Sequence, residues 1–186
     1  SQLGPVRDGL LLQAKGRRFS LQALLGGDPS LAAEFDEGCF ATIYLSPSHY
    51  HRVHMPLPGT LRETIYVPGK LFSVNQLTAE RVDHLFARNE RLVCIFDTDC
   101  GPMALILVGA MILGSIDTVW AGQAAPAPLG LRRTDYQHQR PAVQIARGGE
   151  MGRFKLGSTA IVVFAENRVE LNSALAAGHH INMGER

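Results

Sequence analysis

The stretch that decides the fold is FKLGSTAIVVF, residues 154–164. After Thr159 its residues are apolar and mostly β-branched, a composition that predicts a buried strand. In front of this strand lies the small dipeptide Gly157-Ser158. Glycine lets the backbone bend and lets another group approach its carbonyl, and the serine hydroxyl could attack that carbonyl if a base took its proton. The spacing alone also fits an ordinary strand start, because Gly-Ser-Thr is common turn chemistry.

The composition is that of a globular chain. Its 186 residues predict one domain, and an apolar fraction of 46% is enough for a core. A net charge of +1 favours neither a nucleic-acid partner nor a strongly anionic membrane. There is no signal-peptide pattern, and the longest apolar run, residues 103–116, is too short to span a bilayer. The chain begins at Ser1 without methionine, and we therefore expect a fragment that begins inside a domain.

Short apolar segments separated by turn residues predict a chain made mostly of strands. The expected fold is mainly β (α+β), with a barrel-like or sandwich core of short, mostly antiparallel strands and two or three small helices. The expected strands are residues 10–14, 39–45, 61–67, 91–96, 103 to a turn near Gly114, 115–120, 143–147, 159–164 and 169–171.

The sequence also predicts two helices and one long surface loop. Ser20 is expected to cap a short helix that Gly26 ends. Thr78 is expected to cap a surface helix that runs to Asn89, because its apolar residues recur at helical spacing. Residues 121–142 lack periodicity and are rich in Gly, Pro, Ala and Gln, which predicts a surface excursion.

Three cysteines, Cys39, Cys94 and Cys100, are odd in number and irregularly spaced. Cys39 and Cys94 lie in apolar runs, so we expect buried thiols in a reducing compartment rather than bridge partners. No paired spacing typical of a zinc site is present.

Three histidines, His49, His51 and His54, lie within six positions beside a loop. They could bind a metal, since histidine is a common zinc ligand. They could be inert residues that make hydrogen bonds at a strand end. They could also perform acid–base catalysis, for which the histidine pKa is suited. On a strand, the side chains of His49 and His51 would lie on one face and that of His54 on the other. No paired carboxylate motif lies around these histidines, which argues against a metal site.

Several strings of the sequence resemble one family. Residues 150–159, EMGRFKLGST, closely resemble the self-cleavage segment of phosphatidylserine decarboxylases of the bacterial and mitochondrial type, which carry LGST. Residues 50–56, YHRVHMP, resemble another string of this family. The resemblance extends from about Leu11 to Phe164, and several uncommon strings in the right order make it specific. Further similar strings are Leu71–Asn75, Leu85–Arg91, Gly101–Met103, Gly114–Ile116 and Val119–Gly122.

The resemblance implies a self-processing enzyme. Ser158 would attack the Gly157 carbonyl and turn the amide into an ester. Elimination would leave a dehydroalanine, which hydrolyses to a pyruvoyl group and ammonia. A single decarboxylase domain, residues 1–186 without its amino-terminal part, would thus become a β chain of residues 1–157 and an α chain of residues 158–186. The pyruvoyl ketone would form a Schiff base with the substrate amine and accept the electrons released with carbon dioxide.

The resemblance also assigns the histidines. His54 matches the family's triad base, which would activate Ser158. His51 matches the histidine tied to decarboxylation, where it would give a proton to the carbanion. No metal is implied. In the family, an aspartate upstream of the residue matching Ser1 orients the base; Asp8 precedes a glycine in a different context, and the role does not transfer to it.

The expected protein is therefore a phosphatidylserine decarboxylase proenzyme that makes phosphatidylethanolamine on the cytoplasmic face of a bacterial inner membrane. Its expected partners are phosphatidylserine, a membrane surface bound peripherally, and the second chain of an α/β heterodimer, which could assemble into a homo-oligomer. One alternative is a hydrolase that uses Ser158 and His54, although no nucleophile elbow surrounds the serine. Another is a non-catalytic, carrier-like β module that binds lipid.

Overall fold

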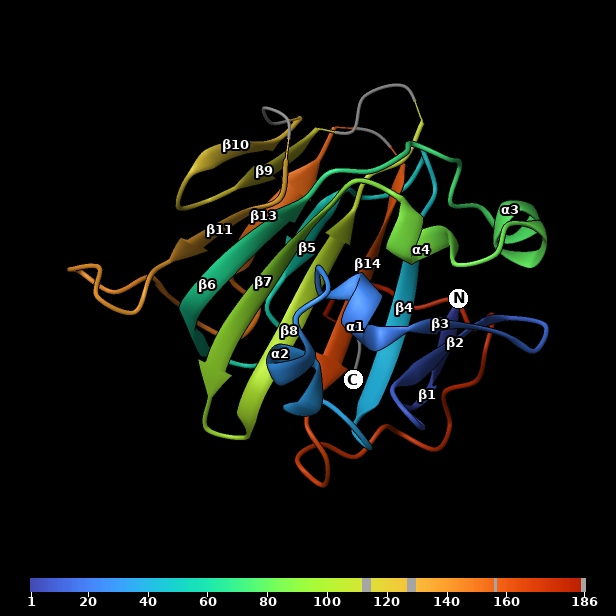
Figure 1. Ribbon diagram of the computed structural model, residues 1–186, viewed down its shortest axis with the longest axis horizontal. Coiled ribbons are helices and arrows are strands. Elements are labelled where there is room, and N and C mark those ends of the chain that lie inside the picture. Colours follow the sequence, from blue (N-terminus) through green and yellow to red (C-terminus); the bar gives the residue numbers. More distant parts are fainter. Residues whose placement is uncertain (112–114, 127–129, 156, 185–186) are drawn as a thin grey trace.

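The computed structural model describes residues 1–111, 115–126, 130–155 and 157–184. In this part of the chain the strands form a large sheet, a four-stranded sheet and a two-stranded hairpin, all with antiparallel pairings (Figure 1). The large sheet has the order β1-β4-β14-β8-β7-β6-β11, and β12 also pairs with β6. Its strands are β1 (Gln2–Pro5), β4 (Cys39–Leu45), β6 (Gly59–Val67), β7 (Arg91–Thr98), β8 (Gly101–Val108), β11 (Arg132–Asp135), β12 (Gln144–Ile145) and β14 (Ser158–Phe164).

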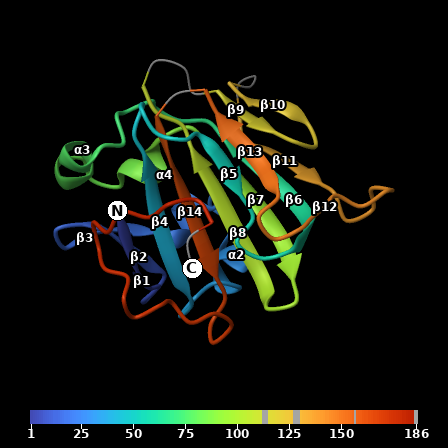
Figure 2. The same cartoon turned by 180° about the vertical axis from the view of Figure 1, so that it is seen from behind.

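The four-stranded sheet has the order β10-β9-β13-β5 and covers one face of the large sheet (Figure 2). An apolar cluster joins the two sheets, with Val53, Ile116 and Phe154 on one side and Leu105 and Val162 on the other. Its strands are β5 (Arg52–His54), β9 (Ile116–Thr118), β10 (Gly122–Ala125) and β13 (Glu150–Phe154).

The prediction of a mainly β fold is confirmed. The large sheet ends at β1 on one side and at β11 on the other, so the described strands do not close into a barrel. Of the two arrangements expected, the sandwich is the one observed. In a sandwich, the apolar side chains on the inner faces of the two sheets pack against each other and are buried.

β14 lies inside the large sheet, and the predicted strand after Thr159 is confirmed. It pairs with β4 from Ser158 to Phe164 and with β8 from Thr159 to Phe164. All its residues are buried. Alternate residues face opposite sides, so Ala160 and Val162 pack toward the four-stranded sheet. Ser158 shares their face.

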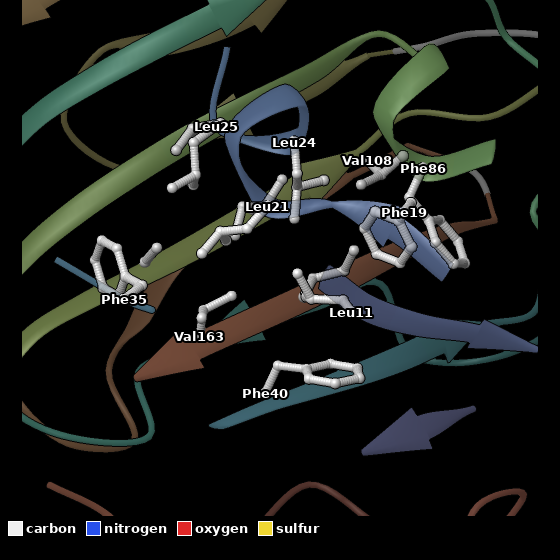
Figure 3. Packing of buried hydrophobic residues seen from close by; sticks show 14 of the residues in the cluster. Leu11, Phe19, Leu21, Leu24, Leu25, Phe35, Phe40, Phe86, Val108 and Val163 are labelled. Atoms are coloured by element: carbon white, nitrogen blue, oxygen red, sulfur yellow. The ribbon is translucent and has the colours of Figure 1, made fainter. Parts of the chain in front are cut away.

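The other face of the large sheet is covered by helices and by the hairpin of β2 (Leu10–Ala14) and β3 (Arg17–Ser20). Figure 3 shows Leu11, Phe19 and Leu21 packed with Val163 of β14. Four small helices lie in the described residues, one more than the upper limit expected. They are α1 (Leu21–Leu24), α2 (Pro29–Ala33), α3 (Gln76–Arg81) and α4 (Leu85–Arg88).

The helix caps follow local chemistry. Ser20 caps α1 as predicted, because its hydroxyl accepts a hydrogen bond from the Ala23 backbone N–H. The predicted surface helix from Thr78 to Asn89 is wrong: Val82 is extended and His84 is left-handed, with φ of 55°, so the segment divides into α3 and α4. α4 is also no surface helix, since Leu85 and Phe86 are buried.

Other predicted elements differ in detail. The excursion of residues 121–142 contains two strands, β10 and β11, which pair with β9 and β6. Residues 169–171 form no strand. The turn predicted near Gly114 lies outside the described residues. No helix in the described ranges is both long and apolar enough to cross a membrane.

All three cysteines are free thiols. Cys94 is fully buried as expected. Cys39 is only half-buried, and its Sγ lies 3.6 Å from the Val169 carbonyl oxygen.

Candidate active site

The candidate site lies where β14 begins. Ser158 is only 1% exposed and is paired with Leu45 at the end of β4. Its Oγ is buried and has no hydrogen-bond partner among the described residues. A buried hydroxyl without a partner costs free energy, and such groups often mark functional atoms.

Gly157, directly before this serine, lies against Pro47. A Cβ atom added at Gly157 would lie 3.0 Å from both Cγ and Cδ of Pro47. Such contacts are too short for carbon atoms, which prefer about 3.5–4.0 Å. A side chain at position 157 would therefore force Pro47 or the local backbone to move.

The histidines reach this site through β5, which pairs with β13. The backbone N–H of Phe154 donates to the His51 carbonyl at 2.9 Å. Arg52 Nη1 also donates to Glu150 Oε2 at 2.6 Å, and this hydrogen bond raises the pKa of Arg52. This pairing places the His51 end of the YHRVHMP string beside Phe154, three positions before Gly157.

His51 has one engaged and one free ring nitrogen. Its Nε2 lies 3.2 Å from the Pro47 carbonyl oxygen. A carbonyl can only accept, so Nε2 carries the hydrogen and Nδ1 has the free lone pair. Nδ1 is buried and has no partner in the described part of the chain. Pro47 thus touches Gly157 with its ring and fixes the His51 tautomer with its carbonyl.

His54 has both ring nitrogens engaged. Its Nδ1 lies 2.8 Å from the Gly148 carbonyl oxygen, which places the hydrogen on Nδ1. Its Nε2 then accepts from the Tyr50 hydroxyl at 2.8 Å, and the two rings are stacked with centroids 5.7 Å apart. His51 is thus connected to Gly157 through Pro47, whereas the contacts of His54 are to Gly148 and Tyr50, and neither histidine has a hydrogen bond to Ser158 within the described residues.

The third histidine of the cluster does not join the site. His49 packs edge-on against His180 of the carboxyl-terminal segment, with ring centroids 5.8 Å apart. Among the described residues, no group of three or more His, Cys, Asp or Glu side chains is placed to hold a metal ion.

The sequence did not indicate the two carbonyls that set the histidine tautomers. Gly148 and Pro47 act through backbone oxygens, which every residue type carries, so residue identity gives no signal. Ser46-Pro47 could be recognised only as a turn. The pairing of β5 with β13 would be needed to place these oxygens, and that pairing joins residues about a hundred positions apart.

Comparison with known proteins identifies the family. The family model described as phosphatidylserine decarboxylase matches residues 1–186. This chain belongs to that family. It is 59% identical over 187 residues to a phosphatidylserine decarboxylase proenzyme of Pseudomonas putida, and 60% identical over 186 residues to one of Pseudomonas fluorescens. Each alignment covers 100% of this chain and 65% of the relative, so the chain spans about two thirds of its relatives' length. The resemblance predicted from LGST and YHRVHMP is confirmed.

Proposed function

We propose that this chain carries the active site of a pyruvoyl-dependent phosphatidylserine decarboxylase, which releases carbon dioxide and leaves phosphatidylethanolamine. The supporting relatives are named phosphatidylserine decarboxylase proenzymes. The observation that carries the proposal is the Ser158 hydroxyl, which is buried without a partner among the described residues and directly follows a glycine in close contact with Pro47. These features fit a prosthetic group made from Ser158 itself.

The proposed self-cleavage uses these residues directly. The Ser158 Oγ attacks the carbonyl carbon of Gly157 while its proton passes to a base, and the amide becomes an ester. Elimination then releases the Gly157 carboxylate. Addition of water and loss of ammonia leave a ketone at position 158. The missing Cβ of Gly157 leaves its carbonyl open to this attack.

His54 is the proposed base. Its Nδ1–H is held by the Gly148 carbonyl, so Nε2 is the basic nitrogen. The Tyr50 hydroxyl now occupies that lone pair and would have to leave. Tyr50 is 53% exposed, so its displacement gives up little buried area. Two observations support His54 as the base: its tautomer leaves Nε2 without a hydrogen, and the chain matches the family.

His51 is the proposed proton donor of the decarboxylation step. Its Nδ1 is buried and unpartnered within the described ranges, which leaves a position for a proton to be taken up and given back. The pyruvoyl group, once present, supplies an electrophilic ketone and accepts the electron pair set free as the carboxylate leaves. The protein then has to hold the substrate and keep water away.

We further propose that residues 1–186 form one domain, with a β chain of 1–157 and an α chain of 158–186 that stay associated. The sheet supports this, because β14 keeps β4 and β8 as partners on either side. Peripheral binding to the cytoplasmic face of a bacterial inner membrane is proposed from the phospholipid substrate and the bacterial relatives. Cell fractionation tests that location, and recovery only in the supernatant would oppose it.

Intact mass spectrometry tests the proposal on the full-length protein. The expected small fragment starts at residue 158 and weighs one ammonia less than the same fragment with a serine end. The purified protein should release carbon dioxide from phosphatidylserine. Ser158→Ala, which lacks the attacking hydroxyl, should stay uncut and inactive. An ordinary serine amino terminus, or an active uncut protein, would contradict the proposal.

A further inference from the structure

A buried, hydrogen-bonded pair of polar side chains lies on the large sheet near the start of β14. Glu90 is 6% exposed and Tyr66 is 4% exposed. The Tyr66 hydroxyl donates to Glu90 Oε1 at 2.5 Å. Glu90 lies in the string Leu85–Arg91 that resembles the family, but the mechanism above gives no role to Glu90 or to Tyr66.

The Glu90 carboxylate has no ion pair among the described residues. The neighbouring Arg91 does not neutralise it, since its guanidinium donates to the Leu24 carbonyl at 2.7 Å and to other backbone carbonyls on the helical side. Glu63, another buried glutamate of this sheet, is paired with Arg133. Of these two glutamates, Glu90 alone has no cation beside it in the described part of the chain, and burying a carboxylate without a cation is costly.

The strand register places Glu90 in one row with Ser158. Thr159 pairs with Val108, and Val108 pairs with Arg91. If both registers are continued by one position, Ser158 pairs with Gly109 and Gly109 pairs with Glu90. The three residues therefore lie side by side across the sheet. The Gly109 backbone N–H donates to the Glu90 carbonyl at 2.9 Å, which supports this continuation.

Both side chains lie on the same face. Glu90 shares its face with Leu92, and Ser158 shares its face with Ala160. Leu92 and Ala160 both belong to the apolar cluster between the two sheets. Gly109 stands between them in the row and carries no side chain. Two strand spacings separate the Ser158 and Glu90 Cα atoms by about 10 Å.

We infer that Glu90, oriented by Tyr66, binds the ammonium group of the phosphatidylserine head group. The inference rests on the proposed function, which requires a primary amine beside position 158. A single positive charge of that size complements a buried carboxylate, and Gly109, which lies between Glu90 and Ser158 in the row, contributes no side chain of its own. Glu90 is thereby assigned as a substrate-binding residue and Tyr66 as a positioning residue.

The test measures binding without catalysis. In the full-length protein with Ser158→Ala, which keeps the chain uncut, short-chain phosphatidylserine is titrated by calorimetry beside its N-acetyl form, which has no ammonium. Adding Glu90→Gln should weaken binding of phosphatidylserine about 10- to 150-fold, the range of a hydrogen bond to a charged group. Binding of the N-acetyl form should not change. Glu63→Gln is the matched control and should change neither.

Three results would overturn the inference: equal phosphatidylserine binding with and without Glu90→Gln, an equal loss for both lipids, or no preference for phosphatidylserine in the Ser158→Ala parent. If thermal melting shows that the Glu90→Gln variant is not folded, the Tyr66→Phe variant is tested in its place. It removes only the orienting hydroxyl, and an undiminished preference for phosphatidylserine would then refute the assignment. Carbon dioxide release by the unsubstituted protein tests the proposed function separately.

Discussion

The contact between Gly157 and Pro47 makes Gly157→Ala an informative perturbation. The new methyl carbon would lie 3.0 Å from Cγ and Cδ of Pro47 and 3.2 Å from its nitrogen. The pyrrolidine ring is rigid, so the ring as a whole or the Gly157 backbone must move by roughly half an ångström to reach normal contact. Either movement shifts the carbonyl that Ser158 has to attack.

The magnitude follows from where Pro47 lies. Overpacking a closed core costs about 1–3 kcal/mol. Pro47 is exposed, and its loop can yield outward, so we expect the low end of that range. A penalty of about 1 kcal/mol in the attack geometry slows self-cleavage about fivefold. The fold should survive, because the site of the change lies at the edge of the packed layers.

The assay follows loss of the uncut chain on denaturing gels after synthesis, for the unsubstituted protein, Gly157→Ala, Pro47→Ala and the double variant. Pro47→Ala removes Cγ and Cδ, the two atoms that the methyl would meet at 3.0 Å, so the double variant should cut faster than Gly157→Ala alone. Comparing the four proteins as a double-mutant cycle isolates the energy of this contact. Two results would refute the reasoning: Gly157→Ala cutting at the unsubstituted rate or faster, or no recovery in the double variant.

Three other predictions concern the histidines and a thiol. His54→Ala should accumulate uncut precursor, with cleavage slowed about 10²–10⁴-fold by loss of the base; normal processing on a gel would remove His54 from that role. His51→Ala should still be cut but should release carbon dioxide from phosphatidylserine about 10²–10⁴-fold more slowly, and an uncut or fully active variant would show that the division of roles is wrong. Burial raises the pKa of the Cys94 thiol, so iodoacetamide at pH 8 should label Cys100 in the folded protein and Cys94 only after unfolding, as peptide mapping by mass spectrometry would show; early labelling of Cys94 would contradict its burial.

Local signals in the sequence were sufficient for elements that local chemistry decides. The apolar run after Thr159 gave β14, and Ser20 gave the cap of α1, because neighbouring residues determine both. The segment from Thr78 to Asn89 has helical spacing, yet tertiary packing overrides it: Leu85 and Phe86 turn into the core after a break at His84. Propensity is a weak guide when burial decides.

The site was predictable only where residue type carries the chemistry. Ser158 and the histidines could be found as a hydroxyl and as imidazoles, but Glu90 sits in a charged string whose burial is not visible in the sequence. Its place in the row with Ser158 depends on two strand pairings, β14 with β8 and β8 with β7. A one-residue slip in either register would turn that carboxylate to the other face.

The position of β14 is also compatible with the proposed self-cleavage, because the strand that carries the site would keep its partners after the cut. The proposed cut lies at the start of β14, so the whole strand belongs to the carboxyl-terminal chain, and its pairings with β4 and β8 hold the two chains together. Pulling the strand out would expose Ile161, Val162, Val163 and Phe164, each worth about 1.5–3 kcal/mol of burial. The free energy that holds the strand therefore does not depend on the broken peptide bond. The new end at residue 158 stays between the sheets, on the face that also carries Glu90. A cut further along the strand would divide the buried residues of β14 between two chains, and a cut before β13 would place the paired strands β5 and β13 in different chains.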